Sequence, residues 1–343
     1  MLSEGMRGRR TNTFTLQWHL TNACELACKH CYDRSSLQDL ELDDCRLILR
    51  EFQSFCHVHR VQGQVSVTGG NPMLHPGFWE LYREIRQASL RVSILGNPLD
   101  EEPLARLVAA GRPGYYQVSL EGLPHTNDAI RGAGHFDRTV EFLEAAVRHG
   151  LNTHVMLTVH QRNLDEVLPL GRQLSPVVRK FTFNRLAQVG EGHSLPLPEK
   201  SAYTRFLREY LEAAAENPHL AVKENLCNLL RCEDRRPVLQ GCTGFGCGAA
   251  FNFVAVLPDG EVHACRKFPS PLGRLPDQSL TDIYRSPAAR AYRRGPITCA
   301  RCSINRHCRG CMAVIAGHGV DPLAGPDPMC FRDEMTQARS SIR

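Results

Sequence analysis

The segment Leu20-Thr-Asn-Ala-Cys24-Glu-Leu-Ala-Cys28-Lys-His-Cys31-Tyr32 decides how the rest of this sequence is interpreted. It places three cysteines at C-x3-C-x2-C spacing directly after an apolar stretch that is typical of a strand. Thiolates prefer soft metals and iron–sulfur clusters. Three cysteines would leave one iron of a four-iron cluster without a protein ligand, and a small molecule could coordinate there. The alternative is a zinc site, which would need a fourth ligand that is not close by in the sequence.

The composition is that of a globular protein of the cytoplasm. The 343 residues can form one large or two ordinary domains, and 42% of them are hydrophobic. The net charge of +5 is mild and the basic residues are scattered, which argues against a nucleic-acid partner. No apolar run approaches the length of a membrane span, and no secretory leader is visible. Fifteen cysteines in such a chain indicate metal binding in a reducing cytoplasm rather than disulfides.

Strand-like and helix-like segments alternate over the first half of the chain. The apolar pattern predicts strands at residues 13–21, 64–68, 91–95, 115–120, 154–159 and 180–186. It predicts helices between them at residues 42–59, 76–88, 101–110, 137–149 and 164–174. Six such units favour a parallel sheet covered by helices, and the handedness of the crossovers would curl it into an open barrel. The predicted fold class is therefore α/β, a partial (β/α)6 barrel; a full eight-unit barrel is the alternative, but the pattern stops after six.

The second half of the chain has a different composition. A polar link at residues 190–198 precedes an amphipathic helix predicted at 198–216, and ten of the fifteen cysteines lie between Cys227 and Cys330. The apolar core after residue 240 is predicted to be small, so metal sites would have to hold it together. The predicted division is a leader at 1–12, the barrel at 13–195, a helical bridge at 196–236, a small cysteine-rich domain at 237–332 and a tail at 333–343.

Further motifs follow the predicted strands. In barrels of parallel strands the chemistry lies at the carboxyl ends of the strands, so we expect these motifs to meet at one site. Thr68-Gly-Gly-Asn-Pro72 has two glycines that let the backbone approach a ligand. Ser119 and Glu121 supply a hydroxyl and a carboxylate suited to hydroxyl recognition. Arg131 could bind a carboxylate with both arms of its guanidinium, or cap a helix, or form a surface ion pair.

The three-cysteine motif resembles that of the radical S-adenosylmethionine (radical SAM) superfamily. The resemblance implies that SAM chelates the open iron through its amine and carboxylate. One electron from the cluster then cleaves SAM to methionine and a 5′-deoxyadenosyl radical, which abstracts a hydrogen atom. The family's Gly-Gly-Glu-Pro and Ser-Leu-Asp-Gly motifs resemble Gly-Gly-Asn-Pro and Ser-Leu-Glu-Gly here, and the former variant looks like that of maturases for small Cys- or selenocysteine-containing peptides. His30 falls where the family has an aromatic residue beside the adenine, or it is a solvated loop histidine. The cofactor-binding residues implied are His30, Gly69, Gly70, Asn71, Asn97, Ser119 and Arg131, with Asn184 as a weaker candidate.

The later cysteines resemble the SPASM domain, the auxiliary-cluster extension of radical SAM peptide maturases. The resemblance implies two further four-iron clusters, the first held by Cys242, Cys247, Cys265 and Cys311 and the second by Cys299, Cys302, Cys308 and Cys330. Only two residues separate Cys308 from Cys311, one fewer than in the family, so a ligand swap or an open iron stays possible. Cys227 and Cys232 could serve instead, although a buried free thiol is the simpler interpretation of each. Cys45 and Cys56 lie on a predicted helix and are interpreted as core or surface thiols.

The resemblance implies a radical SAM maturase that abstracts hydrogen from a ribosomally made precursor peptide and installs an oxidative crosslink such as a thioether. Its cofactors would be SAM and three [4Fe-4S] clusters, and its reductant a flavodoxin- or ferredoxin-type protein. Since the barrel starts at residue 13, the leader peptide would be held by a separate protein or added to a sheet edge.

Two alternatives stay open. One is a sulfatase-type (formylglycine) or small-molecule radical SAM oxidoreductase, and the other is a zinc-knuckle binding module. The sulfatase branch has a carboxylate base directly after the cysteine that corresponds to Cys265, whereas this chain has Arg266-Lys267. These cations argue against formylglycine formation. They would suit an anionic thiolate or an acidic peptide, or form a solvated basic turn.

Overall fold

The computed structural model describes residues 12–238, 242 and 246–332, so the predicted tail and nearly all of the predicted leader lie outside the described residues. Within these ranges, six parallel strands pair in the order of the sequence. They are β1 (Thr13–Thr21), β2 (Gln62–Gly69), β3 (Arg91–Leu95), β4 (Tyr116–Ser119), β5 (Thr153–Val159) and β6 (Lys180–Arg185). The predicted six-strand parallel sheet is therefore confirmed.

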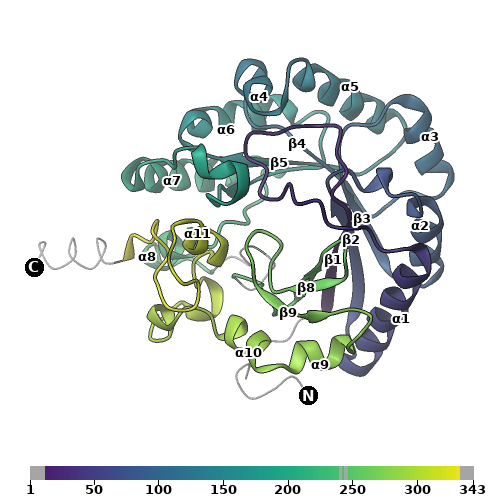
Figure 1. The fold of residues 1–343 in the computed structure, drawn as a ribbon. Coiled ribbons are helices and arrows are strands. Elements are labelled where there is room, and N and C mark those ends of the chain that lie inside the picture. The colour runs from purple at the N-terminus through teal and green to yellow at the C-terminus, as the bar shows by residue number, and fades with distance from the viewer. Residues whose placement is uncertain (1–11, 239–241, 243–245, 333–343) are drawn as a thin grey trace, which may run out of the picture.

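Helices cover the outer side of this curved sheet (Figure 1). They are α1 (Leu42–His59), α2 (Phe78–Gln87), α3 (Glu101–Ala109), α4 (Pro124–Arg131), α5 (His135–Arg148), α6 (Val167–Leu174) and α7 (Lys200–Glu216). Alternation along β1 explains the two sides of the sheet. Phe14, Leu16 and Trp18 are buried in the main core, whereas Thr15 and Gln17 line a cavity inside the barrel. The ring centroids of Phe14 and of Phe55 on α1 lie 4.6 Å apart, which shows how closely this helix covers the strand.

The elements differ from the sequence prediction mainly at their ends. A 3-10 helix at Pro72–Leu74 precedes α2, and another at Gln161–Glu166 takes the first part of the helix predicted at 164–174. Helix α4 was not predicted; it is only eight residues long and begins with a proline, so the sequence reads as a turn. No helix in the described ranges combines the length and apolar character that crossing a bilayer requires.

The C-terminal segment continues the barrel sheet. Strand β7 (Phe253–Val256) pairs in parallel with β1, and β8 (Glu261–His263) and β9 (Pro271–Arg274) follow it antiparallel. Val254, Val256 and Val262 join the main core, whereas a small second cluster forms around Phe268 and Met312. This segment therefore has the small core that was predicted and also packs into the main core. One sheet runs across the predicted domain boundary.

Helices complete the C-terminal segment, which occupies the open side of the curved sheet in Figure 1. They are α8 (Cys227–Glu233), α9 (Leu280–Arg285), α10 (Pro287–Arg294) and α11 (Met312–Gly317). Two 3-10 turns, Ile297–Cys299 and Asn305–His307, carry part of the cysteine-rich sequence between α10 and α11. The cysteines of this segment therefore sit largely on short turns and loops.

Candidate active site

The three-cysteine loop lies at the carboxyl end of β1 and lines a cavity of about 390 Å³ with Cys24, Cys28 and Cys31. Most of the other predicted site residues line the same cavity. They are His30, Gly69, Gly70, Asn97, Ser119, Arg131 and Asn184. The expectation that the strand-end motifs meet at one place is confirmed, while the role of each residue toward SAM stays a prediction.

The two glycines after β2 are required by the cysteine loop itself. A Cβ atom would lie 2.2 Å from the Thr21 carbonyl oxygen at Gly69 and 2.2 Å from the Ala23 carbonyl oxygen at Gly70. The backbone N–H of Gly70 donates to the Thr21 carbonyl over 2.8 Å. Glycine was expected here for approach to a ligand, but the close approach that the structure shows is between two loops of the chain.

Asn71 does not line the cavity, so the structure gives no support to its predicted contact with SAM. Its Oδ1 accepts from the backbone N–H of Met73 over 3.2 Å and caps the 3-10 helix that follows. Its Nδ2 donates to both carboxylate oxygens of Glu25, over 3.0 and 3.1 Å. The side chain is therefore used to join the cysteine loop to the loop after β2.

The three thiols are free, and polar donors face two of them, which fits a cluster held by thiolates. Asn97 Nδ2 lies 3.5 Å from Cys24 Sγ, and Arg131 Nη1 lies 3.6 Å from Cys28 Sγ. Burial raises the pKa of the Cys28 thiol, and the nearby Arg131 charge acts in the opposite direction. Asn97 and Arg131 thus place hydrogen-bond donors beside two thiols of the loop, and such donors favour the anionic form of a thiol.

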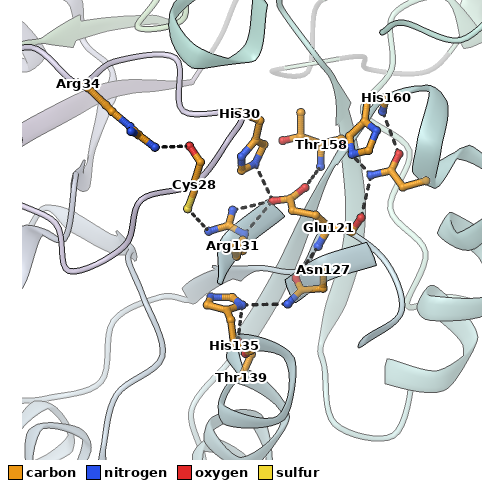
Figure 2. A network of polar contacts seen from close by, with 11 residues as sticks. Cys28, His30, Arg34, Glu121, Asn127, Arg131, His135, Thr139, Thr158 and His160 are labelled. Atoms are coloured by element: carbon orange, nitrogen blue, oxygen red, sulfur yellow. Dashed lines mark hydrogen bonds and ion pairs between the residues drawn. The ribbon is translucent and has the colours of Figure 1, made fainter. Parts of the chain in front are cut away.

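A buried carboxylate, Glu121, organises the wall of this cavity (Figure 2). Its side chain has no exposed surface, and its Oε1 accepts from Arg131 Nη2 over 2.6 Å and from His30 Nε2 over 2.9 Å. Its Oε2 accepts from the backbone N–H of Thr158 over 2.7 Å. Burial alone would raise the pKa of this carboxyl, but His30 and Arg131 hold it well below its usual range.

This network corrects three sequence interpretations. His30 is not a solvated loop histidine, since only 8% of its side chain is exposed and it is paired with Glu121. Arg131 forms a buried ion pair rather than a surface one, with 11% of its side chain exposed. Glu121 is committed to these partners and does not offer a free carboxylate for hydroxyl recognition. A carboxylate two residues beyond a buried strand was the signal that could have indicated a buried ion pair.

A second cavity of about 580 Å³ lies inside the barrel and is lined by Cys242, Cys247, Cys265 and Cys311. These are the four cysteines predicted for the first auxiliary cluster. The other four do not line it. Burial, followed by the charges of Cys302 and Cys330, raises the pKa of the Cys299 thiol to about 11. Four of the eight cysteines thus line one cavity, and their assignment to two clusters stays a prediction.

The short spacing between Cys308 and Cys311 is accommodated by two consecutive left-handed residues, Arg309 and Gly310, with φ of 64° and 63°. The Arg309 side chain turns into the core and donates to the carbonyls of Arg293 and Cys247. Because the backbone reverses so tightly, Cys308 and Cys311 can belong to different thiol groups.

The remaining cysteines have varied surroundings. Cys227 is buried on α8, and Cys45 and Cys56 are buried on α1, whereas Cys232 is exposed, which contradicts its interpretation as a buried thiol. Within the described residues, no three His, Cys, Asp or Glu side chains are gathered as a single metal ion would require.

Sequence reasoning also missed a second buried ion network, at Arg185 on β6. Its Nη1 and Nη2 donate to the two carboxylate oxygens of Asp327, each over 2.7 Å, and its Nε donates to Glu224 over 2.9 Å. Asp327 in turn accepts from the backbone N–H of Cys311 over 2.8 Å. This network therefore fixes the end of β6 to a cysteine of the second cavity.

Comparison with known proteins gives two family matches and three informative similarities. Residues 18–174 match the radical SAM superfamily, and residues 247–312 match the SPASM iron–sulfur cluster-binding domain. The mycofactocin maturase of Mycobacterium ulcerans is 30% identical over 338 residues, covering 92% of this chain and 87% of the relative. The AdoMet-dependent heme synthase of Methanosarcina barkeri is 26% identical over 329 residues, covering 87% and 90%. The crystal structure of Streptococcus suis SuiB bound to precursor peptide SuiA has a TM-score of 0.72 at 16% identity, covering 93% of this chain and 76% of SuiB, and shows a shared fold.

Proposed function

Because this chain belongs to the radical SAM superfamily and carries a SPASM iron–sulfur cluster-binding domain, we propose that it is a peptide maturase. It abstracts a hydrogen atom from a ribosomally made precursor peptide and leaves an oxidative crosslink, such as a thioether, in the product. The similarity to a mycofactocin maturase over most of both chains supports a maturation reaction. The type of bond formed in the peptide is a further part of this proposal.

One observation carries the proposal: the cavities of the two sets of thiols share part of their walls. The cavity at the three-cysteine loop and the cavity at Cys242, Cys247, Cys265 and Cys311 share lining residues, among them Gln117, Met156 and Asn184. A substrate in the shared part would lie between a site for SAM and a site for an auxiliary cluster. An oxidative crosslink needs such an arrangement, because the substrate first loses a hydrogen atom and then an electron that must be accepted.

The residues present fit these cofactors. SAM and a reduced four-iron cluster supply, when bound, a radical that removes hydrogen from an unactivated carbon. Cys24, Cys28 and Cys31 would hold that cluster, and Gly69, Gly70, Asn97, Ser119 and Arg131 would border SAM. The two later thiol groups would hold two auxiliary clusters, which gives three clusters in all.

The chain's own residues position and shield the reacting groups. Glu121 holds His30 and Arg131 in place, so the guanidinium stays beside Cys28 and the imidazole ring stays on the cavity wall. The Nδ1 atom of His30 is buried and has no hydrogen-bond partner among the described residues. We further propose a flavodoxin- or ferredoxin-type reductant, and a separate protein or a sheet edge that recognises the leader peptide.

Anaerobic co-expression with a short Cys-containing peptide encoded beside the gene tests the proposal. We expect the peptide to lose the mass of two hydrogens and its thiol to resist alkylation. Cys28→Ala should abolish 5′-deoxyadenosine formation, whereas Cys232→Ala, on an exposed cysteine outside both cavities, should not. SAM cleavage that persists in Cys28→Ala would refute the radical assignment.

A second candidate is oxidation of a small molecule, and the similarity to the heme synthase of Methanosarcina barkeri favours it. The co-expression experiment also distinguishes a peptide substrate from a small-molecule substrate. A peptide of unchanged mass in cells where the enzyme still cleaves SAM would count against the maturase and in favour of a small-molecule substrate. Incubation of the reduced enzyme and SAM with iron coproporphyrin would then be the next assay.

A further inference from the structure

We infer that the space between the two thiol sets binds a carboxylate of the substrate, and that Arg266 and Lys267 are its ligands. This inference rests on the proposed function, since it concerns the substrate that enters this space. It deepens that proposal by naming a chemical group that the substrate must carry. The group is a side-chain carboxylate of Asp or Glu, or the free C-terminal carboxylate of a peptide.

Arg266 and Lys267 lie where the two cavities meet. Both residues line the cavity of the three-cysteine loop and also the cavity of the first auxiliary thiol group. They follow Cys265 directly, in the loop after β8, so the fold places two adjacent cations in the wall of the shared space. Both are partly buried, and neither forms the solvated basic turn that the sequence allowed.

The positive charge of these two residues is not neutralised by a carboxylate of the described chain. Arg266 Nη1 donates to the Thr68 hydroxyl over 3.2 Å, and its guanidinium lies 5.8 Å from the centre of the Tyr32 ring. No ion pair is formed by Arg266 or Lys267 in the described residues. Arg185, the neighbouring cation in the same wall, is by contrast paired with both Asp327 and Glu224.

Apart from its four thiols, the second cavity has an excess of cations. Arg91 and Lys223 also line it, whereas Glu224 is the one carboxylate among its described lining residues and is already bonded to Arg185. Partly buried cations without an ion-pair partner cost folding free energy, because water solvates them incompletely. A ligand that brings its own negative charge would remove this cost and gain charge-assisted hydrogen bonds.

The donor set of this cavity argues that the anion is a carboxylate rather than a substrate thiolate bound to iron. Four thiols surround it, which provides one for each iron of a four-iron cluster. A cluster with all four ligands has no open iron for a sulfur atom of the substrate. A guanidinium and an ammonium in one wall can donate to the two oxygens of a carboxylate, the former by its planar pair of donors.

A binding assay without reductant tests the inference independently of catalysis. Affinity for the fluorescently labelled precursor peptide is measured with the full chain, its clusters and SAM present. Lys267→Gln should weaken binding by about tenfold or more, since a hydrogen bond to a charged group is lost, while Lys267→Arg should retain most of the affinity. Lys180→Gln is the matched control, because Lys180 lies outside both cavities and donates to the Pro218 carbonyl.

Peptide variants identify the source of the carboxylate. Asp→Asn or Glu→Gln substitutions and a C-terminal amide are each tested against the unaltered enzyme and against Lys267→Gln. Removing the carboxylate that binds should lower the peptide affinity of the unaltered enzyme. It should not lower the affinity of Lys267→Gln any further, as expected for coupled partners in a double-mutant cycle. If every peptide substitution lowered the affinity equally for the unaltered enzyme and for Lys267→Gln, the inference would be overturned.

Two further readouts separate this inference from other uses of the cations. If Lys267→Gln shifts the reduction potential of an auxiliary cluster and leaves peptide affinity unchanged, the lysine serves the cluster and the inference fails. If Arg266→Gln weakens the affinity for SAM and not for the peptide, the arginine serves SAM and the inference also fails.

A small-molecule probe tests the carboxylate site even if no peptide is modified and the proposed function is wrong. N-acetylglutamate α-amide should slow acetylation of Lys267, followed by mass spectrometry, while leaving Lys180 unaffected. The glutamine analogue should protect neither residue. Equal protection by both probes, or by neither, would overturn the carboxylate site whatever the enzyme's substrate.

Discussion

The two buried ion networks of this protein are built with opposite charges at their centres. At one, the carboxylate of Glu121 lies between the Arg131 guanidinium and the His30 imidazole. At the other, the guanidinium of Arg185 lies between two carboxylates, Asp327 and Glu224. Each network also reaches a cysteine that is proposed to hold a cluster. Arg131 faces the Cys28 thiol, and Asp327 accepts from the backbone N–H of Cys311.

The difference between them lies in what they join. The Glu121 network connects the loop after β4 to the cysteine loop and to the end of β5, all within the barrel (Figure 2). The Arg185 network connects β6 to Asp327, 142 residues later, and so ties the barrel to the C-terminal segment. We therefore expect damage to the first to affect mainly SAM cleavage, and damage to the second to affect mainly stability.

The largest effect on stability is expected from Arg185→Met. It would leave two carboxylates buried without their cation, which costs about 3–5 kcal/mol of unfolding free energy. The urea midpoint of the anaerobically purified protein measures this loss. Arg208→Met is the control, because the ion pair between Arg208 and Glu233 is partly exposed and contributes about 1 kcal/mol or less. Equal midpoints for the two variants would contradict the importance of the network.

Glu121→Gln should affect catalysis more than stability. The neutral amide cannot hold both Arg131 and His30, so the guanidinium is freed from its position beside Cys28. We expect 5′-deoxyadenosine formation to fall at least about tenfold, with a weaker affinity for SAM measured by equilibrium dialysis. A variant that unfolds more easily yet binds and cleaves SAM normally would show that Glu121 has a structural role only.

Asp327→Asn should give a smaller loss than Arg185→Met. The amide oxygen can still accept from Cys311 or Arg185, and Glu224 still neutralises the guanidinium. We expect a loss of about 1–3 kcal/mol, the range for a hydrogen bond to a charged group. Iron content after reconstitution is a second readout, and it should fall if the backbone at Cys311 is displaced. A loss equal to that of Arg185→Met would mean that Glu224 contributes nothing.

Acidification should give the smallest effect and should act in part through histidines beside the Glu121 network. His135 and His160 lie beside this network, and burial lowers the pKa of each to about 4 (Figure 2). The unfolded chain takes up protons at these residues that the folded chain does not, so stability is full above pH 6.5 and is lost as the pH falls toward about 4. The lowered pKa of Asp327 confines its own loss to still more acidic conditions.

His135→Gln should flatten this pH dependence. The glutamine oxygen can still accept from Asn127 Nδ2, which His135 Nδ1 faces over 3.2 Å, but it takes up no proton. Urea midpoints between pH 4 and 6.5 measure the slope. His125→Gln, on an exposed histidine of α4, should leave the slope unchanged. Identical slopes in the His135 variant and the unaltered protein would refute the assignment.

Structural features that depend on residues close together in the sequence were predicted correctly. The bounds of β1 and α1 agree with the prediction, because their apolar residues follow the periods of a strand and a helix. The cysteine loop, the two glycines and Ser119 were placed at one site for a similar reason, since each follows a strand of a parallel sheet.

Long-range pairing could not be predicted in this way. Glu121 bonds to His30 from 91 residues away, and nothing in the local pattern of either residue indicates the other. Asn71 was assigned to a ligand because the resemblance placed it there, but the acceptor it supplies is taken by a helix cap two residues on. The pairing of β7 with β1 was likewise hidden, because strands of a shared sheet can be separated by any length of chain.

That pairing of β1 with β7 has a consequence for how the protein is made. Thr15 on β1 faces Phe253 on β7, so more than two hundred residues must be synthesised before the first strand gains its second neighbour. At about 5–20 residues per second, one edge of β1 stays unpaired on the ribosome for about 10–50 seconds. The cysteine loop that follows this strand is complete throughout that time. A nascent chain of this kind would need an early-acting chaperone or cluster carrier to protect its exposed strand and thiols.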